Sequence, residues 1–214
     1  MTFAMTSDAV GSIISRVIDE LHLTLTAAGA FQYVPMAAMA AGAVALGFLA
    51  DRLGRKPAII SGLALYGGAS LLFAFGHTFG FFVGLLALSG LGISLFKTGA
   101  LALIGDVSHS AVAHTRLMNA AEGFFGVGSI IGPAIVAALL ARGLSWKWLY
   151  VAAAAICVLL VLLAVGMTFP PRGPRCDGAA QRGDEMSLTG TLLVLRDPFA
   201  LGFASMIVLY VAVE

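Results

Sequence analysis

Charged side chains are scarce in this sequence. Lysine, arginine, aspartate and glutamate make up 11% of its 214 residues, whereas 60% are hydrophobic and the mean hydropathy is +1.00. A soluble core of this size cannot enclose so much apolar surface, so the composition indicates membrane helices. The formal net charge is only +1. No nucleic-acid partner is therefore expected.

Cysteine is also rare, and the two cysteines lie far apart in the sequence. Cys157 falls in an apolar run and Cys176 in a polar stretch, which argues against a disulfide or a metal site. The sequence contains no nucleophile–base pair, metal cluster, phosphate loop or nucleotide-binding domain. It therefore predicts neither an enzyme, nor a resident cofactor, nor an ATP-driven pump. The start of the chain lacks the basic segment of a cleavable signal peptide.

What the sequence does contain is long apolar runs, which predict six membrane spans and the start of a seventh. The six spans form one bundle over residues 1–169 and cover residues 2–20, 26–50, 57–76, 79–105, 116–141 and 145–169. Residues 170–197 are rich in proline, glycine and charge and predict a cytoplasmic linker. Residues 198–214 predict the first part of span 7, which would make the chain an incomplete protein. Because lipid cannot hydrogen-bond the backbone, the fold class expected is an all-α polytopic membrane protein.

Cations are distributed unevenly around these spans. If residues 47–56 face the cytoplasm, most of the 12 lysines and arginines lie on that side of the membrane. The positive-inside rule then predicts a cytoplasmic N-terminus, in a plasma membrane of the bacterial inner-membrane type.

The segment between the second and third spans concentrates charge and glycine. It contains two glycines, one aspartate and three cations: Gly47, Asp51, Arg52, Gly54, Arg55 and Lys56. Glycines permit a close backbone approach, and the Asp51 carboxylate is suited to the positive N-terminus of a helix. A simpler interpretation is a basic stop between two spans, but that would require neither the glycines nor the aspartate.

The pattern G-x-x-x-D-R-x-G-R-K resembles the signature loop between helices 2 and 3 of the major facilitator superfamily. Gly128, Gly132 and Pro133 also resemble that family's span-5 motif, with Val136 and Ala137 in place of its last two glycines. The same residues predict a close-packing helix face followed by a kink. Over its whole length the chain resembles the N-terminal half of such a transporter plus the start of span 7. A weaker likeness is to sugar permeases of the fucose branch. The resemblance implies two six-helix halves that rock about one site.

Polar side chains inside the spans are the candidates for a substrate and proton pathway, because charge in a membrane is costly unless it faces a cavity or a partner. The candidates are Asp8, Arg16, Gln32, Lys97, Asn119 and Glu122. Lys97 and Glu122 are expected at depths that agree to roughly 3 Å on consecutive antiparallel spans. They predict an ion pair, either coupled to transport or holding the two spans together. Asp8, expected in the inner half of span 1, either carries a proton or is simply solvated. Arg16 either contacts a solute or extends to the outer headgroups.

These features together predict a secondary-active transporter of a small polar solute, working by alternating access. Protons are the expected coupling ion, and a sugar symporter is the favoured type. Drug or metabolite efflux by antiport is the alternative mode. The competing class is a non-transporting protein of the same fold, either a sensor or an inactive half. The expected partners are the solute, protons, the lipid bilayer and the second half of the same transporter.

Overall fold

The computed structural model describes residues 1–169 and five helical residues near the C-terminus: 198, 201, 202, 205 and 206. The side chains of residues 48–51 are not described. The chain divides into two units, Met1–Pro171 and Arg172–Glu214. The predicted linker at 170–197 and most of the predicted seventh span lie outside the described residues.

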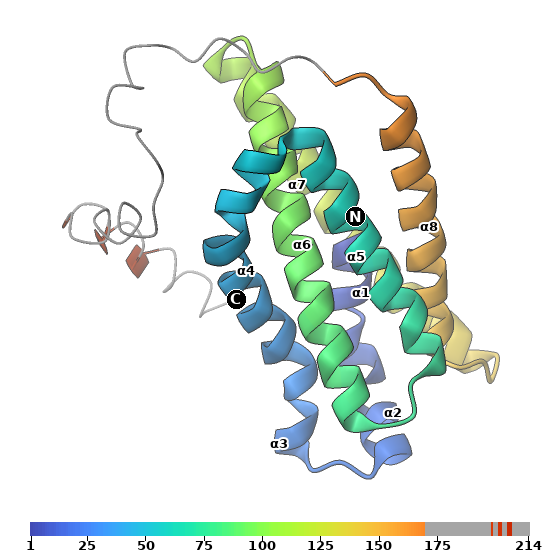
Figure 1. The fold of residues 1–214 in the computed structure, drawn as a ribbon. Helices are drawn as coiled ribbons and strands as arrows, with labels where there is room; N and C mark the ends of the chain where they lie inside the picture. The colour runs from blue at the N-terminus through green and yellow to red at the C-terminus, as the bar shows by residue number, and fades with distance from the viewer. Residues whose placement is uncertain (170–197, 199–200, 203–204, 207–214) are drawn as a thin grey trace. The chain divides into compact units, whose positions relative to one another are not determined.

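Every regular element in the described part is a helix (Figure 1). The elements are α1 (Thr2–Ser7), α2 (Val10–Leu21), α3 (Leu25–Ala28), α4 (Ala30–Leu53), α5 (Arg55–Leu72), the 3-10 turn η1 (Phe73–Phe75), α6 (Phe79–Val107), α7 (Ala111–Ala141) and α8 (Lys147–Gly166). Among the described residues, five stretches are long and apolar enough to cross a membrane: Leu25–Gly47, Arg55–Phe75, Phe79–Val107, Ala111–Ala141 and Lys147–Gly166. The predicted all-α membrane fold is confirmed.

Several predicted boundaries are wrong. The first span is not one helix, because α1 and α2 are separated at Asp8 and Ala9. The predicted interval between the second and third spans, residues 51–56, is reduced to Gly54, since α4 continues to Leu53 and α5 begins at Arg55. The fifth span begins earlier than predicted because the Ser110 side chain caps α7, accepting a hydrogen bond from the Ala113 N–H.

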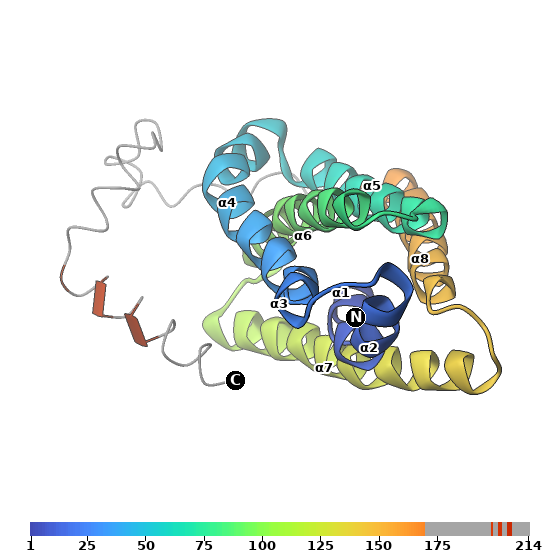
Figure 2. The same ribbon diagram turned by 90° about the horizontal axis from the view of Figure 1, so that it is seen from below.

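Helices that follow each other in sequence are not always neighbours in space. Helix α6 packs chiefly against α4 and α5, α8 covers α5, and α7 packs chiefly against α1. Figure 2 shows α7 on the opposite side of α1 and α2 from α6. The expectation that the fourth and fifth spans adjoin because they are consecutive and antiparallel is therefore wrong.

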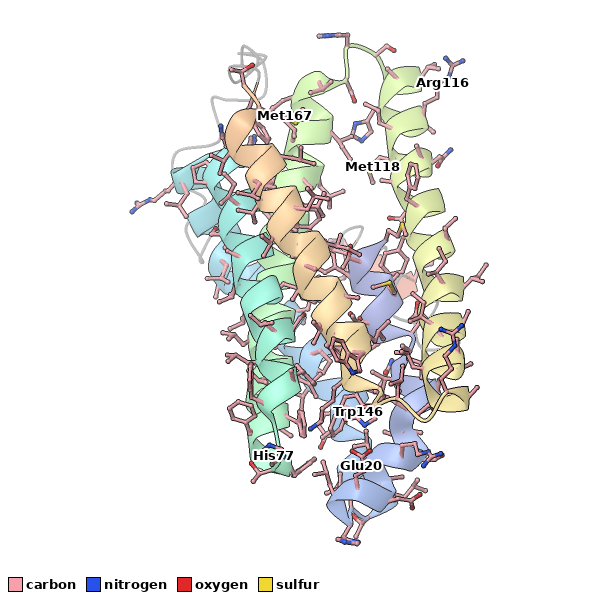
Figure 3. The ribbon with its side chains drawn as sticks, turned by 90° about the vertical axis from the view of Figure 1, so that its right-hand side faces the viewer. Glu20, His77, Arg116, Met118, Trp146 and Met167 are labelled. Carbon is pink, nitrogen blue, oxygen red and sulfur yellow. The ribbon has the colours of Figure 1, made fainter. Side chains whose placement is uncertain are left out.

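The two ends of the bundle differ in composition. Figure 3 shows Glu20, His77 and Trp146 at one end and Arg116 and Met167 at the other. We call these the Glu20 end and the basic end. The basic end carries Arg116 together with the cations in the last turn of α4 and the first turn of α5, which are Arg52, Arg55 and Lys56.

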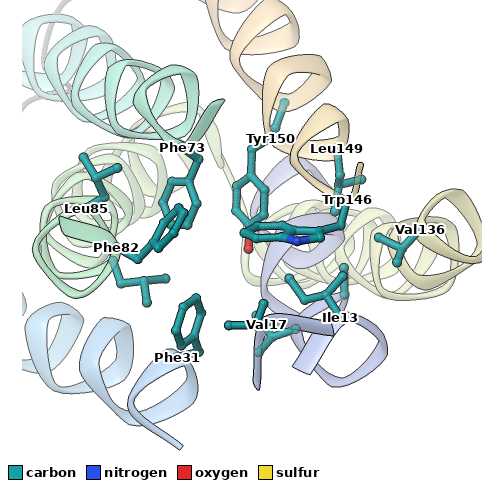
Figure 4. Packing of buried hydrophobic residues seen from close by; sticks show 14 of the residues in the cluster. Ile13, Val17, Phe31, Phe73, Phe82, Leu85, Val136, Trp146, Leu149 and Tyr150 are labelled. Atoms are coloured by element: carbon teal, nitrogen blue, oxygen red, sulfur yellow. The ribbon is translucent and has the colours of Figure 1, made fainter. Parts of the chain in front are cut away.

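Buried aromatic side chains close the Glu20 end (Figure 4). Phe31, Phe73, Phe82, Trp146 and Tyr150 come from the ends of four helical segments and pack into one cluster. The Phe73 and Tyr150 rings stack with centroids 4.3 Å apart and an interplanar angle of 4°. The Trp146 indole Nε1 donates a hydrogen bond to the Glu20 carboxylate at 3.1 Å, which ties the start of α8 to α2. This end of the bundle is therefore densely packed.

Candidate functional site

A cavity of about 160 Å³ lies inside the bundle. Its wall is mostly apolar and includes Phe3, Val10, Phe31, Pro35, Met36, Met39, Leu86, Ile93 and Phe125. The polar and charged groups in the wall are Thr6, Ser7, Asp8, Gln32, Tyr66, Ser89, Lys97 and Tyr150. A mostly apolar pocket with a few placed polar groups is typical of a site for a small organic molecule.

Three of the six predicted pathway residues meet in this cavity. Asp8 lies at the break between α1 and α2, Gln32 in the first turn of α4, and Lys97 within α6. The other three, Arg16, Asn119 and Glu122, do not line it and have exposed side chains. The structure thus separates the six candidates into a cavity group and a group outside it.

Asp8 owes its position to close packing of α1 on α7. A Cβ atom added at Gly132 would overlap the backbone carbonyl of Met5, and one at Gly128 would overlap the carbonyl of Met1. The absence of side chains at these two glycines lets the α1 backbone lie directly on α7. Gly132 lies in the half of α7 nearer the Glu20 end. Asp8, just beyond Met5, is therefore nearer the Glu20 end than the basic end.

Lys97 reaches across the cavity but does not pair with Glu122. Its Nζ lies 5.5 Å from the centroid of the Phe125 ring on α7. Within residues 1–169, side chains of 48–51 aside, Lys97 and Glu122 form no ion pair within 4 Å. The physical reason is that the cavity separates α6 from α7, so the ammonium contacts a ring one turn beyond Glu122. Such a cation–π contact is worth about 0.5–1 kcal/mol at an exposed site.

Sequence reasoning missed the polar contact that crosses the cavity wall. The Thr6 and Tyr66 hydroxyls are hydrogen-bonded at 2.5 Å and join α1 to α5. The Phe3 ring packs edge-on against Tyr66 with centroids 4.5 Å apart. A tyrosine inside an apolar span was the available signal, because a buried tyrosine hydroxyl usually finds a partner.

The segment between α4 and α5 is a sharp joint. Gly54 has φ 92° and ψ 165°, a conformation that L side chains rarely adopt. The Arg55 guanidinium Nε then donates to the Asp106 carboxylate near the end of α6 at 3.0 Å. Asp106 was not among the predicted site residues. Gly47 and Asp51 lie within α4, and the Asp51 side chain is outside what is described.

Two lysines tie α5 to α8 at opposite ends. The Lys56 Nζ, at the start of α5, donates to the carbonyls of Val165 and Met167 at the end of α8, both at 2.8 Å. The Lys147 Nζ, at the start of α8, donates to the carbonyl of Gly76, just past η1, at 2.7 Å. Cations are favoured near the negative C-terminal ends of helices. Each of the two antiparallel helices thus supplies a lysine to carbonyls at or just beyond the end of the other segment.

A bundle of apolar helices around a cavity with charged groups defines an integral membrane protein with an internal cavity. The model of the Major Facilitator Superfamily matches residues 1–214, and the chain belongs to this family. The resemblance seen in residues 47–56 and 128–133 is thereby confirmed.

Curated relatives match part of the chain. It is 33% identical over 133 residues to the multidrug efflux pump LfrA of Mycolicibacterium smegmatis, covering 62% of this chain and 26% of that protein. It is 29% identical over 134 residues to the quinolone resistance protein NorA of Staphylococcus aureus, covering 62% and 33%. It is 31% identical over 116 residues to Protein TsgA of Shigella flexneri, covering 45% and 29%. The matches thus span about a quarter to a third of the length of these relatives.

A solved structure shows the same fold. The inward open conformation of the xylose transporter XylE from E. coli superposes with a TM-score of 0.60 at 16% sequence identity. The match covers 96% of this chain and 52% of that one. The helical arrangement is therefore that of one half of a major facilitator protein.

Proposed function

We propose that this chain is the first six-helix half of a secondary-active carrier that moves small amphipathic organic solutes across a membrane, coupled to protons. The observation that carries the proposal is the cavity, whose wall is mostly apolar yet includes Asp8 and Lys97. The family and its fold point to transport rather than to an enzymatic reaction. A second six-helix half would complete the site.

The composition of the cavity wall favours an amphipathic solute over a sugar. A sugar needs many hydrogen-bonding groups, whereas Phe3, Phe31, Met36, Met39 and other apolar side chains dominate here. The efflux alternative is therefore preferred to sugar symport. Two relatives that are named a multidrug efflux pump and a quinolone resistance protein support this choice.

Asp8 is the proposed proton carrier. Its carboxylate lines the cavity, and no ion-pair partner within 4 Å is present among the described side chains. Keeping a charge at the centre of a membrane costs about 2.5–3.5 kcal/mol on insertion scales. A proton and a cationic group on the solute would therefore replace one another at Asp8. Asn119 and Glu122 lie on α7 between Arg116 and Phe125, and we place them beside the proton path from the basic end.

Alternating access in this proposal uses the two ends of the bundle. With the basic end in the cytoplasm of a bacterial-type membrane, the aromatic cluster around Trp146 closes the outer side. The segment 47–56 is the proposed cytoplasmic latch, and the Asp51 carboxylate is its proposed contact group for a helix of the second half. Asp51→Asn should then abolish transport by the full-length protein without preventing membrane insertion, and unchanged transport would reduce the motif to a topology signal.

The test uses the full-length protein in liposomes with an imposed proton gradient. We expect a rhodamine dye to accumulate against its concentration gradient and to leak back when a protonophore is added. Asp8→Asn should abolish this accumulation, whereas Asp19→Asn, an exposed carboxylate on α2 outside the cavity, should not. Accumulation of labelled xylose but not of the dye would refute the amphipathic solute. Unchanged accumulation by Asp8→Asn would refute the proton role.

A further inference from the structure

We infer that the cavity selects amphipathic solutes that carry one cationic and one anionic group, with Asp8 contacting the cation and Lys97 the anion. This inference rests on the proposed transport of amphipathic solutes and adds the charge type of the solute. It goes beyond the apolar character of the wall because it depends on two specific side chains and on their spacing.

The two charges share one cavity without neutralising each other. Among the side chains that the structure describes, neither Asp8 nor Lys97 forms a hydrogen bond or an ion pair within 4 Å. The contact of Lys97 is the face of the Phe125 ring. Stranded charges inside a membrane protein are costly, and a ligand of complementary charge removes that cost. A solute with a single charge would satisfy one group and leave the other stranded.

Helix register places the two charges on opposite sides of Tyr66. A Cβ atom at Gly92 would lie 2.8 Å from the Tyr66 backbone nitrogen, so the two residues are level. Lys97 lies further along α6 toward the basic end.

The Thr6 hydroxyl meets the Tyr66 hydroxyl, and Asp8 lies beyond Thr6 toward the Glu20 end. The Lys97 ammonium contacts the Phe125 ring, whereas Asp8 lies three residues past Met5, which packs on Gly132. At 1.5 Å per helical residue, this register separates the two charged groups by about 15 Å along α7. Each ionic contact adds about 3 Å, so a solute whose charges are roughly 9 Å apart bridges them.

The wall also includes groups for an apolar body. Phe3, Met39 and Ile93 line the same cavity, and the Phe3 ring lies against Tyr66. Aromatic and methionine side chains accept flat rings of varied shape. The solute class is therefore an aromatic or alicyclic body that carries an amine and a carboxylate.

Four compounds on one scaffold isolate the effect of charge. The zwitterion is 6-(piperidin-1-ylmethyl)naphthalene-2-carboxylic acid, whose two charges lie at opposite ends of the ring system, and its methyl ester keeps only the cationic amine. The 6-(piperidine-1-carbonyl) acid keeps only the carboxylate, and the methyl ester of that acid is neutral. Binding of each to the purified full-length protein is measured by calorimetry, with Lys97→Met, Lys97→Arg, Asp8→Asn and the control Arg142→Met. Arg142 is exposed and does not line the cavity.

For the wild type we expect the zwitterion to bind at least about tenfold more tightly than each of the other three compounds, the effect of one charged hydrogen bond. Lys97→Met should remove its advantage over the cationic ester, and Lys97→Arg should restore it. Asp8→Asn should remove its advantage over the anionic acid, and Arg142→Met should change neither ratio. Equal binding of the cationic ester and the zwitterion by the wild type would overturn the inference, as would a variant that weakens all four compounds equally. Failure of all four compounds to bind the wild type would instead refute the proposed transport of amphipathic solutes, and the inference with it.

Discussion

Replacing Lys56 with methionine should weaken the attachment of α8 to α5. Methionine keeps a long apolar side chain but removes the ammonium that donates to the Val165 and Met167 carbonyls at 2.8 Å. The ammonium also lies 5.7 Å from the centroid of the Phe169 ring. A hydrogen bond from a charged donor contributes about 1.5–3 kcal/mol. Because Lys56 is only half-buried and water replaces part of the loss, we expect the free energy of unfolding to fall by about 2 kcal/mol in total.

Thermal unfolding of the purified full-length protein in detergent measures this loss. At about 2–4 °C per kcal/mol, the midpoint should fall by several degrees. Lys56→Arg, which keeps the charge, should lose less. Arg116→Met is the matched control, because Arg116 is an exposed cation at the same end of the bundle that is not in an ion pair within 4 Å in the described part of the chain. Equal midpoints for Lys56→Met and Arg116→Met would show that the lysine contributes charge to the surface but no attachment of α8.

Three further predictions follow from the packing and the topology. Gly132→Val should block folding because a side chain there overlaps the Met5 carbonyl, whereas Gly126→Val, where a Cβ atom meets nothing within 4 Å, should give a normal yield of monodisperse protein. Gly54→Ala should destabilise the protein by about 1–3 kcal/mol, since φ is 92° there, and an unchanged thermal midpoint would contradict that strain. In intact cells, a cysteine in place of Gly143 should react with an impermeant thiol reagent and one in place of Arg116 should not; the reverse pattern would invert the proposed orientation.

Local sequence properties predicted much of the architecture. Apolar runs of about 20 residues define membrane helices because lipid offers the backbone no hydrogen-bond partner, so every residue of the span must form its backbone hydrogen bonds within the helix. The joint at Gly54 was also foreseeable in part, because a glycine in a charged segment between two apolar runs suggests a conformation that other residues avoid. The glycines at 128 and 132 predicted a close-packing face, and the structure places α1 against them.

Contacts between distant segments were not predictable in the same way. Consecutive antiparallel spans suggested that Lys97 would meet Glu122, yet α7 packs on α1 and the lysine contacts Phe125 instead. Which helices become neighbours depends on how well their whole surfaces pack against each other, and no short stretch of sequence determines this packing. The Thr6–Tyr66 hydrogen bond likewise joins residues 60 positions apart.

By itself the sequence determined the class of protein, the positions of the long apolar runs and the family signature in residues 47–56, because hydropathy and turn chemistry act over short distances. Tertiary structure alone decided which polar groups share a cavity. It brought Asp8, Gln32 and Lys97 into one wall and left Arg16, Asn119 and Glu122 outside it. The physical reason is that a side chain's surroundings depend on how helices rotate and stack against one another, and close approaches such as that of Met5 to Gly132 set this rotation.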